Sequence, residues 1–96
     1  MKENKICLNM IVKNESKIIK RLLNNVLPII DTFCICDTGS SDNTIDIIKQ
    51  FSEQHNIEGK IIKKEFINFE YNRNYSLTEA KKMDCNYILL LDADMI

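Results

Sequence analysis

A chain of 96 residues with 45% hydrophobic and 28% charged side chains has the composition of one small globular domain, which excludes a disordered protein. Its formal net charge is −1, with both signs interspersed, so it has no basic surface of the kind that binds nucleic acid. The sequence has no apolar segment as long as a membrane span, and its first residues are too polar for a signal peptide, so we expect a cytoplasmic protein.

Seven secondary structure elements are predicted from apolar runs and helical spacing, and they alternate between strand and helix. In chain order, beginning with a strand, they cover residues 6–12, 16–26, 32–36, 43–55, 60–65, 71–83 and 87–91. Pro28 ends the first helix, and Ser41 or Asp42 is placed to cap the second. The last strand has five apolar residues in a row, which is typical of a strand buried on both faces.

The βαβαβαβ order indicates one α/β domain, residues 1–96, with a parallel sheet and helices flanking it. Ligands of such sheets bind beyond the carboxyl ends of the strands. Polar residues follow three of the predicted strands, and we expect them to meet at one edge: Lys13, Asn14 and Glu15 after the first, Asp37 and Gly39 after the second, and Asp92 and Asp94 after the last.

Asp37 directly follows a hydrophobic strand and begins a turn in which Gly39 can take a positive φ angle. A carboxylate fixed there can accept a hydrogen bond from a base N–H or a ribose hydroxyl. The turn has one glycine and no following lysine, so it is neither a dinucleotide-binding motif nor a P-loop. The alternative to a ligand-binding role is that Asp37 only forms an Asx turn. We favour ligand binding for Asp37 and helix capping for Asp42.

Asp92 and Asp94 share one face of an extended backbone, with Cα atoms roughly 6 to 7 Å apart. Mg²⁺ and Mn²⁺ prefer carboxylate oxygens and are often held by one or two carboxylates together with substrate phosphates. A lone D-x-D sequence is also a common turn former at a strand end. The buried strand that precedes it favours the metal-binding interpretation.

Arg73 lies early in the third predicted helix, where it can reach the same edge with directional, permanently charged donors. Its neighbour Asn72 is expected on the solvent face. The four cysteines lie inside or next to apolar runs, which favours buried free thiols over disulfides or a zinc site: Cys7, Cys34, Cys36 and Cys85.

Four segments, MIVKNES, CDTGSSDNT, NRNYSLTEA and ILLLDAD, resemble in order and spacing the family 2 glycosyltransferases of the GT-A (nucleotide-diphospho-sugar transferase) fold. The resemblance covers nearly the whole chain. It implies an inverting transferase of the hexosyl type that uses a nucleotide-sugar donor, often a UDP-sugar, with Mn²⁺ or Mg²⁺ on the diphosphate.

The resemblance also implies roles for individual residues. Asp37 would contact the base with help from Arg73, and Asp92 would contact the ribose or the metal. The remaining assignments are Asp94 as a metal ligand and Asn14 and Glu15 at the border of the nucleotide pocket.

Members of this family continue past the D-x-D motif into an acceptor-binding half, which supplies the general base for transfer. No residue of this chain is identified as that base. We therefore expect a truncated donor half that binds the nucleotide-sugar without independent transfer. The last strand would lie at an open edge, where a missing acceptor half or a second copy could pair.

Two alternatives stay open. A hydrophobic strand that ends in D-x-D also resembles haloacid dehalogenase-like phosphatases, but their second aspartate is usually followed by threonine or Gly-Thr, and here Met95 and Ile96 follow. The other alternative is a non-enzymatic α/β interaction module, or a remnant of an enzyme, that dimerises through its last strand.

Overall fold

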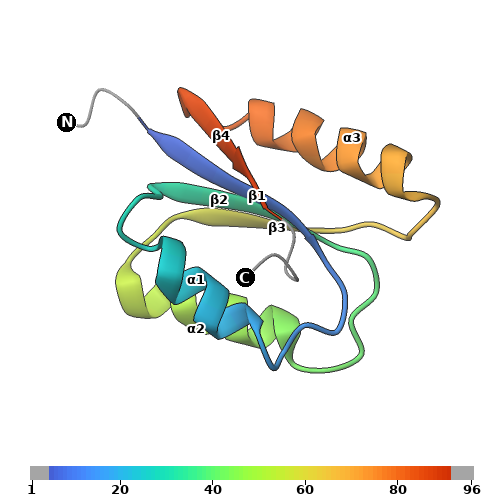
Figure 1. Cartoon of the computed structure of the whole chain (residues 1–96), viewed down its shortest axis with the longest axis horizontal. Helices are drawn as coiled ribbons and strands as arrows, with labels where there is room; N and C mark the ends of the chain where they lie inside the picture. Colours follow the sequence, from blue (N-terminus) through green and yellow to red (C-terminus); the bar gives the residue numbers. More distant parts are fainter. Residues whose placement is uncertain (1–4, 92–96) are drawn as a thin grey trace.

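The computed structural model describes residues 5–91. The described elements alternate in the predicted order: β1 (Ile6–Val12), α1 (Ile19–Val26), β2 (Thr32–Asp37), α2 (Thr44–His55), β3 (Gly59–Lys63), α3 (Phe69–Lys81) and β4 (Tyr87–Leu90). The four strands form one parallel sheet in the order β3-β2-β1-β4, as Figure 1 shows. The predicted α/β fold with a parallel sheet and flanking helices is confirmed.

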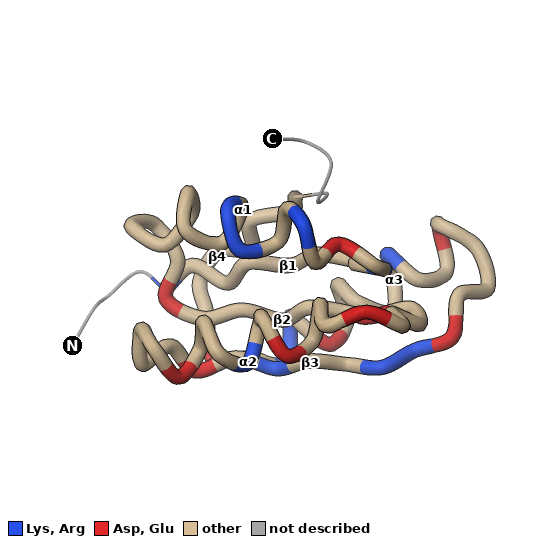
Figure 2. Tube along the Cα trace, turned by 90° about the horizontal axis from the view of Figure 1, so that it is seen from below, with Lys and Arg blue, Asp and Glu red and all other residues tan. Residues whose placement is uncertain are grey.

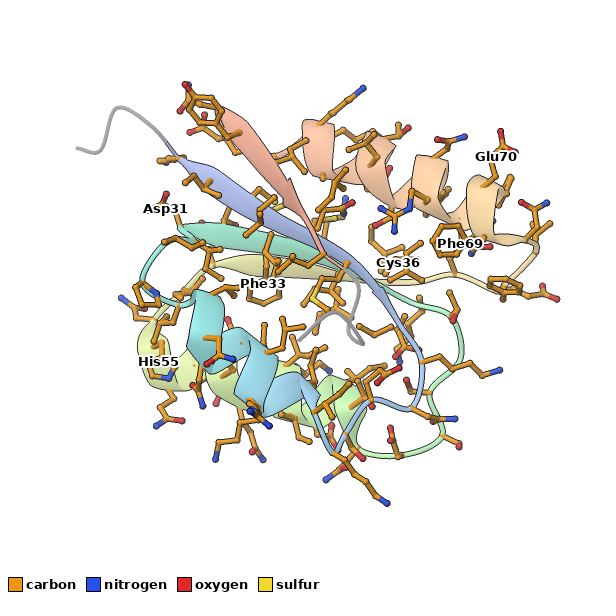
Figure 3. The ribbon with its side chains drawn as sticks, viewed as in Figure 1. Asp31, Phe33, Cys36, His55, Phe69 and Glu70 are labelled. Atoms are coloured by element: carbon orange, nitrogen blue, oxygen red, sulfur yellow. The ribbon has the colours of Figure 1, made fainter. Side chains whose placement is uncertain are left out.

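Helices α1 and α2 cover one face of the sheet, and α3 covers the other. The larger core lies between the sheet and the first two helices, where Phe33 is among the largest buried side chains (Figure 3). Successive side chains of a strand point to opposite faces, so β2 sends Phe33, Ile35 and Asp37 to the α1 and α2 face. The core on this side of the sheet is built from twelve buried residues: Leu8, Met10, Val12, Ile19, Leu22, Leu23, Val26, Ile30, Phe33, Ile35, Ile48 and Phe51.

A smaller core lies under α3 and includes Cys7, Cys34 and Ala80. The Nδ2 of Asn9, in the middle of β1, donates hydrogen bonds to the Oγ (2.8 Å) and the carbonyl oxygen (3.2 Å) of Ser76 in α3. Because both residues are buried, these bonds satisfy polar groups that water cannot reach and fix the helix on the sheet.

The cysteines are free thiols, as predicted. Cys7, Cys34 and Cys36 are buried, and Cys85 is half-buried. Burial raises the pKa of the Cys7 thiol to about 12 and that of the Cys34 thiol to about 11, since a thiolate would lose its hydration. These side chains therefore pack as small apolar groups.

The starts of α1 and α3 differ from the prediction by three and two residues, for local reasons. Helix α1 begins at Ile19 instead of residue 16, because the carbonyl of Glu15 accepts hydrogen bonds from the N–H groups of Ile18 and Ile19 in a preceding turn. Helix α3 begins at Phe69, before the predicted residue 71, because the side chain of Asn68 caps it by accepting from the Tyr71 N–H at 2.7 Å.

The prediction that the last strand is buried on both faces is wrong for its described residues. Tyr87 is 59% exposed and Leu90 is 43% exposed. Within residues 5–91 this strand pairs only with β1, so its other side lies at the edge of the sheet, in agreement with the predicted open edge. None of the helices in this range is long and apolar enough to span a membrane.

The expectation that Asn72 faces solvent is also wrong. Asn72 is fully buried in the first turns of α3. Its Nδ2 donates to the carbonyl of Glu65 at 3.1 Å, and its Oδ1 accepts from the N–H of Ile67 at 2.9 Å. The side chain thus holds the extended linker between β3 and α3, whose backbone groups have no strand partner at these positions.

Candidate functional site

The carboxyl ends of β1, β2 and β3 lie level with one another. Val12 pairs with Asp37, and Asp37 pairs with Lys63, so the last residues of three strands stand side by side. β4 also ends at this edge of the sheet, but its last paired residue, Leu90, stands beside Asn9, three residues before Val12. Of the three strand ends expected to meet, those of β1 and β2 are therefore adjacent, and the end of β3, which was not expected there, lies beside them.

Asp37 is the buried acid at this edge, with only 3% of its surface exposed. Its Oδ1 accepts hydrogen bonds from the N–H groups of Gly39 (2.9 Å) and Ser40 (2.8 Å). Gly39 takes a φ angle of 126°, a conformation that favours glycine and lets the chain turn back onto the carboxylate. The Asx turn that was the alternative interpretation is present, and it uses one oxygen of the carboxylate.

The other oxygen of Asp37, Oδ2, is buried and has no hydrogen-bond partner among the described residues. Buried polar atoms are normally paired, because leaving one unpaired costs about 1–3 kcal/mol. A carboxylate oxygen can only accept hydrogen bonds, so its missing partner must be a donor. The turn holds one oxygen in place and leaves the other without a partner among the described residues.

Asn14 joins the loops that follow β1 and β2. It has a left-handed backbone, with a φ angle of 53°, and its N–H donates to Ser40 Oγ at 2.8 Å. Its Oδ1 accepts from the N–H groups of Ser41 (2.7 Å) and Asp42 (3.3 Å). The side chain of Asn14 therefore shapes the loop beside Asp37, and its Oδ1 is already engaged.

Glu15 and Asp42 continue this junction. The N–H of Glu15 donates to Thr44 Oγ1 at 2.9 Å, while Asp42 accepts from the N–H groups of Thr44 and Ser16. Asp42 also accepts from the Thr44 hydroxyl, and these hydrogen bonds lower the pKa of its carboxyl to about 2. The N-cap position of α2 is Asn43, whose side chain makes no capping hydrogen bond, and Asp42, one residue earlier, accepts from the N–H of Thr44, the first residue of the helix.

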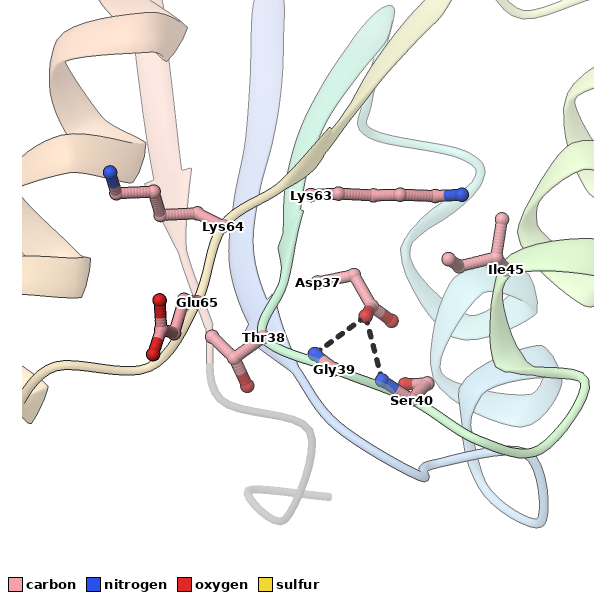
Figure 4. A pocket seen from close by; sticks show the side chains of 8 residues that line it. All are labelled: Asp37, Thr38, Gly39, Ser40, Ile45, Lys63, Lys64 and Glu65. Carbon is pink, nitrogen blue, oxygen red and sulfur yellow. Dashed lines mark hydrogen bonds between the residues drawn. The ribbon is translucent and has the colours of Figure 1, made fainter.

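An open cavity of about 280 Å³ lies against Asp37 (Figure 4). In the figure, Lys63 extends across it toward Ile45 of α2, whereas Lys64 extends to the opposite side, toward α3. The cavity is lined by eight residues: Asp37, Thr38, Gly39, Ser40, Ile45, Lys63, Lys64 and Glu65. Sequence reasoning missed Lys63, because its place beside Asp37 depends on the pairing of β2 with β3.

Arg73 is half-buried in α3, on the sheet face opposite to α1 and α2. Its guanidinium lies over the ring of Phe69, 4.8 Å from the centroid. Phe69 marks the start of this helix in Figure 3. Arg73 is thus near the carboxyl edge but is not among the residues that line the cavity beside Asp37.

Asp92 and Asp94 lie outside the described residues, so the metal-binding hypothesis for them stays a prediction. Within residues 5–91 there is no group of three histidine, cysteine, aspartate or glutamate side chains that could hold a metal ion. Figure 2 shows charges of both signs along the chain, with positively charged segments at α1 and at the end of β3.

The sheet and its flanking helices have the GT-A fold. The chain aligns with the structure of glucosyl-3-phosphoglycerate synthase from Mycobacterium tuberculosis in complex with UDP, with a TM-score of 0.66 and 13% identity over 98% of this chain and 35% of that one. The structure of the same enzyme with Mn²⁺ and UDP-glucose also gives a TM-score of 0.66, at 13% identity over 98% of this chain and 34% of that one.

The chain belongs to glycosyl transferase family 2, whose model matches residues 7–96. It is 33% identical over 89 residues to the poly-beta-1,6-N-acetyl-D-glucosamine synthase of Staphylococcus epidermidis. That match covers 86% of this chain and 20% of the relative, so the chain spans about one fifth of the relative's length. The predicted resemblance to this family is confirmed.

Proposed function

We propose that this chain is the nucleotide-sugar-binding part of an inverting glycosyltransferase of the hexosyl type. The observation that carries the proposal is the buried, unpartnered Oδ2 of Asp37 at the carboxyl edge of the sheet. A nucleobase that enters the adjacent cavity can donate an N–H to this oxygen and satisfy it. The solved structures with bound UDP and UDP-glucose support a uridine nucleotide as the ligand class.

The loop junction would supply the rest of the pocket border. Asn14 and Glu15 follow β1 directly, and hydrogen bonds hold their loop against the turn that carries Asp37. Arg73 offers a permanently charged guanidinium near the same edge, where it would assist in binding the nucleotide. In this proposal the described residues bind the nucleoside portion of the donor.

A divalent cation, Mn²⁺ or Mg²⁺, would bind the diphosphate through Asp94, with Asp92 contacting the metal or the ribose. Two carboxylates one residue apart provide the hard oxygen donors that these ions prefer. The bound ion would neutralise charge on the departing nucleoside diphosphate. The metal complex of the mycobacterial enzyme supports this part of the proposal.

Calorimetric titration with UDP, with and without Mg²⁺, tests the proposal. Asp37→Asn is expected to weaken binding about tenfold, because the amide can place an N–H against the N–H of the base. Asp94→Ala is expected to abolish the effect of Mg²⁺ on UDP binding. Asp46→Asn, an exposed acid of α2 outside the cavity, is the matched control and should bind UDP as the wild type does.

Two results would contradict these roles. Equal binding with and without metal in the wild type would remove Asp94 from its role. Unchanged affinity in Asp37→Asn would remove the base contact.

The unpaired side of β4 supports a second proposal, in which two copies associate through this edge. Tyr87 and Leu90 are exposed large apolar residues on this strand. Sedimentation of the wild type should then show a dimer, and Leu90→Lys should give a monomer, because a charge on an edge strand opposes pairing. A wild type that sediments as a monomer at high concentration would exclude this association.

A further inference from the structure

Lys63 is the strand neighbour of Asp37. The two residues are paired in the parallel β2–β3 ladder, so their side chains leave the same face of the sheet. Ile61, two residues earlier in β3, packs against the core under α1 and α2, which places Lys63 on that face as well. In Figure 4 both Asp37 and Lys63 border the cavity on the side of α2.

The adjacent lysine has a different environment. Lys64 Nζ lies over the rings of Tyr75 and Tyr71, 5.0 and 5.5 Å from their centroids, on the side of α3. Lys63, in contrast, forms no ion pair or side-chain hydrogen bond with any residue in the range 5–91. Its ammonium group is therefore available to a ligand in the cavity.

The cavity is thus lined by one unpartnered acceptor and one cationic side chain, which come from paired residues of β2 and β3. The acceptor is Asp37 Oδ2 alone, because Oδ1 is occupied by Gly39 and Ser40. Ile45 adds an apolar wall from α2, against which a flat ring can lie. A ring that fits this arrangement carries an N–H donor next to a carbonyl oxygen.

Uracil meets this requirement in two orientations. Its N3–H lies between two carbonyl oxygens, so a uracil that donates to Asp37 Oδ2 places a carbonyl oxygen on the Lys63 side in either orientation of the ring. Cytosine has no hydrogen on N3, and its amino group lies at the end of the edge, so cytosine must shift sideways to donate. Guanine presents two neighbouring N–H donors, for which only one free carboxylate oxygen is available.

We infer that Lys63 contacts a carbonyl oxygen of the base and, together with Asp37, selects uracil. This inference rests on the proposed nucleotide-binding function and adds a second base-contacting residue to it.

Titration with UDP, CDP, GDP and N3-methyl-UDP, each with Mg²⁺, tests the inference on the full chain. The wild type is expected to bind UDP about tenfold more tightly than CDP or GDP. Lys63→Met should weaken UDP binding about tenfold and CDP binding less than threefold, so that the preference nearly disappears. Lys63→Arg keeps a cationic donor and should retain the preference.

Lys49→Met is the matched control, because Lys49 is an exposed lysine of α2 that does not line the cavity. It should leave both UDP affinity and the UDP preference within about twofold of the wild type. Native-like circular dichroism of each variant confirms that the fold is intact, as expected for two side chains outside the cores.

The outcomes separate the inference from the function on which it rests. If N3-methyl-UDP binds poorly and Lys63→Met behaves as the wild type, the Asp37 contact stands and the role of Lys63 is overturned. An equal loss of UDP, CDP and GDP affinity in Lys63→Met would indicate a phosphate contact and would also overturn it, as would a wild type that prefers CDP or GDP. A wild type that binds none of these nucleotides would contradict the proposed function itself.

Discussion

Asn14 and Ser41 hold together the two loops at the carboxyl edge of the sheet, with the Ser41 N–H donating to Asn14 Oδ1 at 2.7 Å. The two residues are far apart in the chain and belong to loops that follow neighbouring strands. Without this bond the turn that carries Asp37 would lose one of its attachments to the loop after β1. The geometry of the candidate site therefore depends on an exposed asparagine.

Substitution of Asn14 should separate its two structural roles. Asn14→Ala loses the Oδ1 acceptor and places a Cβ-bearing residue with no local hydrogen bond in the left-handed region, so we expect a loss of about 2 kcal/mol of unfolding free energy. Asn14→Asp keeps an acceptor and tolerates this conformation, so it should stay within about 1 kcal/mol of the wild type. Urea denaturation of both variants measures the difference. Equal stability of the two would contradict both roles.

Asn72 is expected to stabilise the linker between β3 and α3. Asn72→Ala leaves the carbonyl of Glu65 and the N–H of Ile67 without their partner, so the free energy of unfolding should fall by about 2 kcal/mol. Asn74→Ala, an exposed position two residues further along the same helix, should change it by less than about 0.5 kcal/mol. Urea denaturation compares them, and similar values would show that the linker does not need this anchor.

Residue 59 is expected to tolerate only glycine, because the ring of Phe33, its partner in the β2–β3 ladder, leaves no room for a side chain there. A Cβ at residue 59 would lie 2.1 Å from the nearest atom of this ring. Gly59→Ala should therefore destabilise the fold by about 1–3 kcal/mol through overpacking. Thermal unfolding of Gly59→Ala, Phe33→Leu and the double variant forms the test. The smaller side chain should reduce the cost of the alanine, and strictly additive effects would argue against the contact.

The free energy of unfolding should fall as the pH is lowered, partly because the carboxylate of Asp42 becomes protonated. Its pKa is lowered from 3.8 to about 2 in the folded state, so the unfolded state binds a proton more readily. This contribution is present above about pH 4 and is lost as the pH falls toward about 2. Asp42→Asn should therefore show a shallower loss of unfolding free energy over this range.

Glu79 gives a second, independent test of the same reasoning. Hydrogen bonds from Lys60 and Lys82 lower the pKa of its carboxyl from 4.5 to about 2. Glu79→Gln should therefore also reduce the loss of unfolding free energy as the pH falls. Stability is measured by urea denaturation between pH 5 and pH 2. Variants that keep the full wild-type slope would show that these carboxyls do not drive the acid loss.

The thiols should differ in reactivity according to burial. Cys7 and Cys34 have raised pKa values and buried sulfur atoms, whereas Cys85 is half-buried. A disulfide reagent at pH 8 should therefore modify Cys85 first in the native protein and all four cysteines in urea. Mass spectrometry of timed samples identifies the modified residue. Early modification of Cys7 or Cys34 would contradict the packing under α3.

Local sequence patterns were enough to predict the alternation of strands and helices, the family and the position of Asp37 at a strand end. Apolar periodicity and local capping residues depend on neighbours within a few positions, so they can be read along the chain. For the same reason Asp42 could be predicted to lie at the start of α2, where it accepts from the N–H of Thr44. The roles of Asp92 and Asp94 stay predictions, since both lie outside the described residues.

Which distant residues meet depends on how the elements pack together, and the sequence patterns do not predict it. The pairing of β2 with β3 places Lys63 beside Asp37, and no local pattern specifies this register. The burial of Asn72 depends on the path of the linker, and the exposure of β4 depends on its place at the edge of the described sheet. Contacts of this kind depend on how separate elements pack, because each side chain is satisfied by groups that lie far from it in the sequence.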